Sequence, residues 1–127
     1  MNAPITVKPI GTVIDTTGVV GDAFELPCQR GVRIVVVISA VSGTSPTLTL
    51  KLQSYDGASG TWVDVKGAST LALGATGTTE MTVYPGLTAV VNEAVNAIPG
   101  RRVRIYGTVG GSNTPTVTCS IGVDRLA

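Results

Sequence analysis

The side chains that most often carry catalysis are scarce in this sequence. Its 127 residues include no histidine. The commonest acid–base group at neutral pH is therefore missing, together with the catalytic triads and the zinc or copper sites that depend on it. The carboxylates lie apart, without a closely spaced pair that would suggest glycosidase chemistry. The scattered carboxylates are Asp15, Asp22, Glu25, Glu80 and Glu93. We therefore predict that the protein is not an enzyme and that it holds no cofactor and no metal ion.

The two cysteines, Cys28 and Cys119, leave two interpretations open. They are too few for a thiolate zinc site, and no Cys-x-x-Cys pair occurs. A single disulfide between them is compatible with the sequence. The interpretation that we favour is two small buried apolar residues, because free cysteine often behaves in that way.

A turn-rich segment, Ser54–Trp62, loosely resembles an Asp-box turn, in which Asp and Ser bond their own backbone and Trp packs beneath the turn. Asp56 and Asp64 raise the alternative of a calcium site. Calcium needs roughly six to eight oxygen ligands, and the loop lacks the dense acidic pattern that supplies them. Tyr55 and Trp62 raise a further alternative, a stacking platform for sugars. We predict a structural hairpin, with Trp62 in the core.

Arg101, Arg102 and Arg104 form the only positive cluster. Because side chains alternate along a strand, we expect Arg102 and Arg104 on the same face. One interpretation is a solvated face, or charges that guard an edge strand against pairing. The functional interpretation is a docking site for an acidic protein surface, since guanidinium groups bind carboxylates with two parallel hydrogen bonds. All three arginines are candidate interface residues.

The overall charge and the hydropathy pattern argue against nucleic-acid and membrane partners. The net charge is only +1, whereas a nucleic-acid-binding protein needs a basic stripe. The longest uncharged apolar run begins at Ile34 and is far shorter than a membrane span. The opening residues Met1–Pro4 lack the basic stretch and apolar core of a secretory signal. We expect synthesis in a cytoplasm.

Short β-prone segments separated by turn residues fill the chain. Val and Thr dominate the composition, and 16 glycines and 7 prolines punctuate it. In Thr47–Tyr55, leucines alternate with polar residues, which is typical of a half-buried strand. Val32–Val41 is apolar on both faces, which predicts a central strand covered on both sides. Leu87–Ile98 is ambiguous, and we interpret it as a strand. Further strands are predicted at residues 5–14, 23–26, 62–65, 69–73, 78–84, 101–109 and 116–125.

These segments predict an all-β fold, an antiparallel two-sheet β-sandwich (jelly-roll-like) of about eight or nine strands. Residues 16–127 are expected to form one sandwich domain. Residues 1–15, which Pro9 and Gly11 interrupt, are expected to form an N-terminal extended arm or an edge strand. Such an arm could reach over a partner, so its apolar residues join the candidate interface. These residues are Ile5, Val7 and Ile10.

Two stretches of the chain resemble each other. The sequence Val32-Arg33-Ile34 leads through a Gly/Ser loop and a proline to an alternating strand at Thr47–Leu52. The sequence Val103-Arg104-Ile105 leads through a similar loop and proline to Thr116–Ile121. This internal similarity is compatible with two related hairpins in the two halves of a sandwich. It is equally compatible with chance, because chains rich in Val and Thr resemble themselves easily.

Several strand-and-turn segments resemble a recurring pattern in small virion proteins of tailed bacteriophages. One is Ser45–Gly57 followed by Thr61–Val65. Another is Thr82–Leu87 followed by Gly100–Ile105, and a third is Ser120–Asp124. The resemblance rests on these patterns rather than on a chemical signature.

This resemblance covers roughly residues 30–127. It implies a β-sandwich of the phage particle, often a head decoration or cement protein whose partners are major capsid protein subunits. Such proteins commonly sit as trimers at local symmetry axes. On this basis we expect a structural virion protein that binds and stabilises the assembled head, a homo-oligomer with a trimer favoured, located in the virion after synthesis in the host cytoplasm. The alternative is a tail or baseplate component, or a glycan-binding module of the particle.

Overall fold

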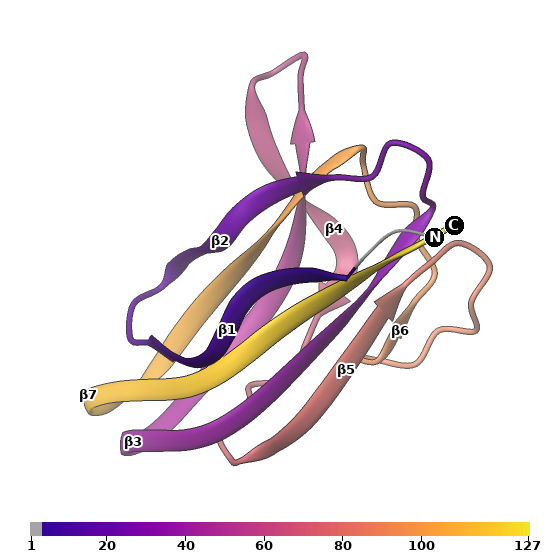
Figure 1. The fold of residues 1–127 in the computed structure, drawn as a ribbon. Coiled ribbons are helices and arrows are strands. Elements are labelled where there is room, and N and C mark those ends of the chain that lie inside the picture. Colours follow the sequence, from indigo (N-terminus) through magenta and orange to yellow (C-terminus); the bar gives the residue numbers. More distant parts are fainter. Residues whose placement is uncertain (1–3) are drawn as a thin grey trace.

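The computed structural model describes residues 4–127, which fold into seven β-strands and no helix (Figure 1). The prediction of an all-β fold is confirmed. Because these residues form no helix, none of them provides a helix that could cross a lipid bilayer. In chain order the strands are β1 (Ile5–Ile14), β2 (Gly18–Glu25), β3 (Gly31–Asp56), β4 (Thr61–Ser69), β5 (Gly77–Val83), β6 (Ala94–Val95) and β7 (Arg102–Leu126).

All seven strands belong to one mixed, open sheet, and two separate hydrogen-bonded sheets are not seen in residues 4–127. The main path runs β1-β7-β3-β5-β6, with β2 paired to β7 and β4 paired to β3. Every strand pair is antiparallel except β5 with β6, which are parallel. The sheet therefore departs from the predicted antiparallel pattern only at its β6 edge.

The strand count is lower than predicted because two strands are unusually long. β3 has 26 residues and β7 has 25. The predicted strands 32–41 and 47–55 are two parts of β3, and the predicted strands 101–109 and 116–125 are two parts of β7. The two strands pair with each other on both sides of a shared bend, so the hydrogen-bonded ladder continues where the sequence suggested two loops.

Glycine allows the bend in both strands. The backbone φ is +99° at Gly43 and +112° at Gly111, angles that residues with a Cβ rarely adopt. A Cβ on Gly43 would lie 2.8 Å from the Pro115 Cα, and one on Gly111 would lie 2.8 Å from the Ser45 carbonyl oxygen. The two chains therefore approach each other closely at the corner, and only glycine fits at these two positions.

The bend folds the sheet over a single core. Figure 1 shows β3 and β7 turning back at the lower left, so that each contributes to two halves of the sheet. We name them the β5 half (β1, β5, β6 and residues 31–42 and 116–126) and the β4 half (β2, β4 and residues 47–56 and 102–110). Buried side chains from both halves form one cluster, for example Ile34 and Leu50, which are at most 1% exposed. Each such side chain contributes about 1.5–3 kcal/mol through burial.

Three strand predictions are wrong in detail, and one of them is the strand predicted at residues 69–73, of which only Ser69 belongs to a strand, β4. Val37 on β3 is 41% exposed, so the first part of β3 is covered on one face only and not on both. The segment Leu87–Ile98 contains only the two-residue strand β6. Val90 and Ala94 bond each other's backbone, and Asn92 between them has a positive φ of 64°. This tight turn leaves residues 87–93 outside the seven strands, although the Glu93 carbonyl accepts a hydrogen bond from the Thr82 N–H of β5.

The cysteines are not joined. Cys119 lies buried on β7, and Cys28 is exposed in the loop before β3. Burial raises the pKa of the Cys119 thiol above its ordinary value, because the charged thiolate loses its hydration there. The expectation of a small buried residue is confirmed for Cys119 and is wrong for Cys28.

The two similar stretches of sequence correspond to β3 and β7. They are not two separate hairpins, because each forms one bent strand and the strands pair with each other. Arg33 on β3 lies opposite Asp124, and Arg104 on β7 lies opposite Gln53. Both arginines bond the side chain of this cross-strand partner. The repeated segments therefore place one arginine on the outer face of each half.

Candidate protein-interaction surface

The outer face of the β4 half gathers aromatic and cationic side chains. Along β3 and β7 the residues that alternate with buried Leu50, Leu52 and Ile105 point outward. This outward set, with one residue from β4, includes three of the chain's five aromatic residues. We call it the cation–aromatic face, and its members are Lys51, Tyr55, Trp62, Arg102, Arg104 and Tyr106.

Strand register brings the cations onto the rings. Trp62 pairs with Tyr55 across the β3–β4 hairpin, and their ring centroids lie 5.2 Å apart. The Arg104 guanidinium carbon lies 4.3 Å from the Trp62 ring centroid. That of Arg102 lies 5.6 Å from the Tyr55 centroid and 5.8 Å from the Trp62 centroid. Each such contact stabilises by about 0.5–1 kcal/mol at an exposed site, so both guanidinium groups are held in place.

A hydrogen-bond network fixes Arg104 from its other side. Arg104 Nε donates to Gln53 Oε1 at 2.8 Å, and Gln53 Nε2 donates to Asp64 Oδ1 at 2.9 Å. Lys51 Nζ donates to the other oxygen of Asp64 at 3.0 Å. Gln53 is buried, so its amide has few alternatives to these partners. Gln53 and Asp64 therefore position the Arg104 guanidinium.

The two positioned arginines keep donors for a ligand. A guanidinium carries five N–H donors, and the network engages Nε of Arg104 only. Among residues 4–127, neither Arg102 nor Arg104 forms an ion pair with a carboxylate. The cation–aromatic face thus presents two fixed cations with free planar donor groups, which suits binding of carboxylates.

The network predicts a shifted titration of Asp64. The bond from Gln53 and, after it, the bond from Lys51 hold the pKa of the Asp64 carboxyl below its ordinary value. A lowered pKa means that the charged form contributes stability at neutral pH, and that this contribution is lost as the pH falls through the lowered pKa. Gln53→Leu is expected to return the Asp64 pKa toward 3.8.

Carboxyl chemical shifts followed by NMR during an acid titration would measure this change. Lys51→Met serves as the matched variant, and it is also expected to raise the Asp64 pKa, because Lys51 acts on the carboxylate through both a hydrogen bond and its charge. An unchanged Asp64 pKa in Gln53→Leu would show that the network does not hold the carboxylate.

The prediction that Trp62 lies in the core is wrong. Trp62 is only partly buried, and it lies on the outer face of β4 beside Tyr55. The hairpin register explains this position, because Tyr55 is exposed and its cross-strand partner points to the same side. Trp62 is therefore available to a partner rather than needed to fill the interior.

Because Trp62 lies on the surface, its loss is expected to lower the free energy of unfolding only modestly. Trp62→Ala removes one cross-strand aromatic pair and two cation–π contacts, which together contribute about 1–3 kcal/mol. A buried tryptophan would cost about 3–5 kcal/mol. Urea unfolding followed by circular dichroism measures the loss, with Leu50→Ala in the core as the reference. A loss for Trp62→Ala as large as that for Leu50→Ala would contradict this assignment.

The candidate arginines do not all lie together. Arg102 and Arg104 share the cation–aromatic face, in agreement with the expected alternation. Arg101 lies just before β7, and its Nε is 3.3 Å from an oxygen of Glu25 at the end of β2. Its charge is thus met by a carboxylate, and it is not part of the face.

The apolar candidates lie on β1, at the edge of the β5 half. Ile5 and Val7 are half-buried and pack against the core cluster. Ile10 is 90% exposed. Of the three, Ile10 alone presents its full side chain to solvent. Residues Met1–Ala3, which belong to the predicted arm, lie outside the described residues.

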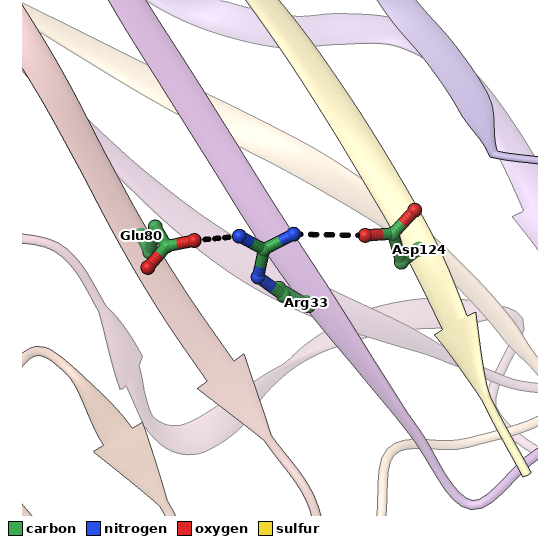
Figure 2. Close-up of polar contacts among 3 residues, drawn as sticks. All are labelled: Arg33, Glu80 and Asp124. Atoms are coloured by element: carbon green, nitrogen blue, oxygen red, sulfur yellow. Dashed lines mark hydrogen bonds and ion pairs between the residues drawn. The ribbon is translucent and has the colours of Figure 1, made fainter.

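On the outer face of the β5 half, the arginine is paired with carboxylates. Figure 2 shows Arg33 between Glu80 on β5 and Asp124 on β7, with the guanidinium reaching a carboxylate on each side. Arg33 lies 3.0 Å from Asp124, and it also forms an ion pair with Glu80. The three residues connect three adjacent strands. Because two carboxylates meet one cation here, this site offers no free positive charge to a partner.

The hairpin loop between β3 and β4 stabilises itself. The Asp56 carboxylate accepts hydrogen bonds from the Ser59 hydroxyl at 2.6 Å and the Ala58 N–H at 3.2 Å. These bonds, the one from Ser59 first, lower the pKa of Asp56. Asp64 instead accepts hydrogen bonds from Gln53 and Lys51. The two aspartates therefore bond different partners. Within residues 4–127, no three Cys, Asp or Glu side chains are grouped so that they could hold a metal ion.

Sequence reasoning missed Lys51, Gln53, Asp64 and Tyr106 as parts of the surface. The signal was present in the alternation, since Tyr106 follows Arg102 and Arg104 at the same spacing of two, and Lys51 and Gln53 share the polar side of Thr47–Tyr55. What the sequence lacked was the pairing of β3 with β7.

Compared with known proteins, the chain matches no family model and no curated protein.

Proposed function

We propose that this chain is a structural virion protein of a tailed bacteriophage, a capsid decoration protein that binds major capsid protein subunits and stabilises the assembled head. The observation that supports contact with capsid subunits is the cation–aromatic face. There Arg102 and Arg104 lie over Trp62 and Tyr55, and their guanidinium groups keep N–H donors free. The virion setting rests on the resemblance of the strand-and-turn segments to small phage proteins.

The composition of the face fits a protein partner. Trp, Tyr and Arg carry most of the binding energy in protein–protein interfaces, because their rings bury large areas and guanidinium groups bind carboxylates in a bidentate manner. The arginines on this face are already oriented by rings and by Gln53, so binding orders few additional side chains. An acidic patch on the capsid surface is the complementary partner.

The proposed architecture is a sandwich of two layers, the β5 half and the β4 half. The shared buried cluster supports it, because side chains from both halves pack in one core. A rigid body of this kind needs no moving part to clamp neighbouring subunits. A homo-oligomer, with a trimer favoured, belongs to the same proposal, since contacts repeated over a shell add up to a high avidity.

Mixing the purified protein with expanded cognate heads that lack it tests this function. We expect saturable co-sedimentation and a higher temperature of head disruption. Raising the salt concentration is expected to weaken binding, because exposed charges are screened. Absence of binding to cognate heads at low salt would contradict the proposal.

A tail or baseplate component, or a glycan-binding module of the particle, is the second candidate. The observation that favours it is the surface position of Trp62 and Tyr55, which places two neighbouring rings outside the core. Against it, the Arg104 guanidinium lies over the Trp62 ring and occupies a stacking face. Cryo-EM of the virion separates the two candidates by showing the protein on the head or on the tail. Glycan binding that is lost in Trp62→Ala would favour the second candidate.

A further inference from the structure

Ile10 forms an apolar knob at the β1 edge of the β5 half. It is 90% exposed, the largest exposed fraction among the large apolar side chains described. Pairing of β1 with β7 is interrupted between Lys8 and Thr12, so Pro9, Ile10 and Gly11 bulge out of the ladder. Gly11 has a φ of +86°, and the Thr12 hydroxyl donates to the Pro9 carbonyl at 2.7 Å. The turn is therefore fixed, and it holds the Ile10 side chain out from the edge.

This edge is poorly suited to strand addition. Proline lacks the N–H that a neighbouring strand would need, and bulges disturb the spacing of the ladder. A second register shift between Thr6 and Lys8 disturbs β1 further. A partner at this edge is thus contacted by side chains, with Ile10 as the anchor, rather than by a continued backbone ladder.

An open cavity with a mixed polar and apolar lining lies at the opposite edge of the same half. It has a volume of about 510 Å³ and lies beside β5. Its apolar lining residues are Leu71, Leu73 and Val91, and polar residues complete the lining: Thr78, Thr79, Glu80, Thr82, Asn92 and Glu93. Leu71 is 65% exposed and Val91 is 86% exposed, so apolar surface continues around its rim. The volume of the cavity exceeds that of a single side chain.

The charges beside the knob and the cavity are complementary. Lys8 directly precedes the knob, and Glu93 and Glu80 line the cavity. Glu80 also meets Arg33 (Figure 2), whereas Glu93 forms no side-chain ion pair among residues 4–127. A lysine that arrives with the knob would therefore meet an available carboxylate.

We propose that copies of this chain associate head to tail, with the Pro9–Ile10 knob of one copy seated in the Leu71/Leu73/Val91 cavity of the next. The two surfaces are different and lie on opposite edges of β1-β7-β3-β5-β6. Such a heterologous contact leaves one knob and one cavity unused in every open assembly, and it produces a finite oligomer when the ring closes. The inference assigns a surface to the homo-oligomer proposed above, and it is independent of the cation–aromatic face and of head binding.

Complementation between two variants tests the proposal. Ile10→Asp removes the knob and keeps the cavity, whereas Val91→Asp spoils the cavity and keeps the knob. Sedimentation velocity of the full chain is expected to show concentration-dependent oligomers for the wild type and monomers for each variant alone. An equimolar mixture of the two variants is expected to form a dimer and nothing larger, because only one productive contact remains.

The controls separate this result from misfolding. Both substituted side chains are almost fully exposed, so circular dichroism melting curves of the variants should match that of the wild type. Ile98→Asp, at a position 74% exposed that does not line the cavity, is expected to keep the wild-type oligomers. A wild type that stays monomeric up to about 1 mM, a limit that corresponds to very weak binding, would overturn the proposal. A mixture of variants that stays monomeric would overturn it as well.

Discussion

Reversing the charge of Arg102 and Arg104 together is expected to abolish binding to phage heads. Each arginine lies on aromatic rings and has no carboxylate partner in residues 4–127. A central interface arginine of this type contributes about 2 kcal/mol or more to binding. Loss of two such residues corresponds to about 4 kcal/mol, or roughly a thousandfold in Kd. Repulsion between the new glutamates and the acidic capsid patch that we propose as the partner adds to the loss.

A matched variant distinguishes the face from a general effect of charge. Arg101→Glu with Lys66→Glu changes the net charge by the same amount at exposed positions outside the face. Co-sedimentation with expanded heads is expected to persist in this control, with a moderate loss at low salt from long-range attraction. Equal loss of binding in both double variants would mean that net charge, rather than the cation–aromatic face, determines binding.

The predictable part of this surface is local. Alternation along a strand correctly placed Arg102 and Arg104 on one face, because side chains in any strand repeat with a period of two. The same rule correctly assigned the buried leucines of Thr47–Tyr55. Neither result requires knowledge of which strands are neighbours.

The remaining part depends on contacts between distant segments. Arg104 meets Gln53 and Trp62 only because β7 pairs with β3 and β3 pairs with β4. Trp62 was expected in the core because tryptophan buries a large apolar area. In the structure, the cations of β7 cover its ring instead. The pattern of a single segment carries no information about a covering group that comes from a strand about forty residues away.

The bend shared by β3 and β7 was not predicted, for a related reason. Glycine and proline between two β-prone segments usually mark a loop, and the sequence has both near Gly43 and near Gly111. Here two such places face each other, so the ladder continues through the turn from Ser42↔Thr116 to Thr47↔Gly110. The corner therefore holds the two halves together, and its glycines carry a larger share of the stability than ordinary loop glycines.

Gly111→Ala is accordingly expected to lower the free energy of unfolding by about 3 kcal/mol, since strained backbone angles cost about 1–3 kcal/mol and a steric clash adds to that cost. At a φ of +112° the new Cβ would lie 2.8 Å from the carbonyl oxygens of Ser45 and Thr44. Both are backbone atoms of the paired strand, so relief requires a shift of the corner itself. Because one core is shared by both halves, such a shift also loosens packing away from the bend.

Urea unfolding of the Gly111→Ala variant, followed by circular dichroism, measures this loss. Gly57→Ala is the matched control, because its φ is not positive and no atom lies within 4 Å of the added Cβ. That control is expected to be neutral or slightly stabilising, since alanine restricts the unfolded chain more than glycine does. Equal stabilities for the two variants would mean that the corner yields to a methyl group without cost. In that case the bend would be a consequence of the packing of the two halves and not one of its causes.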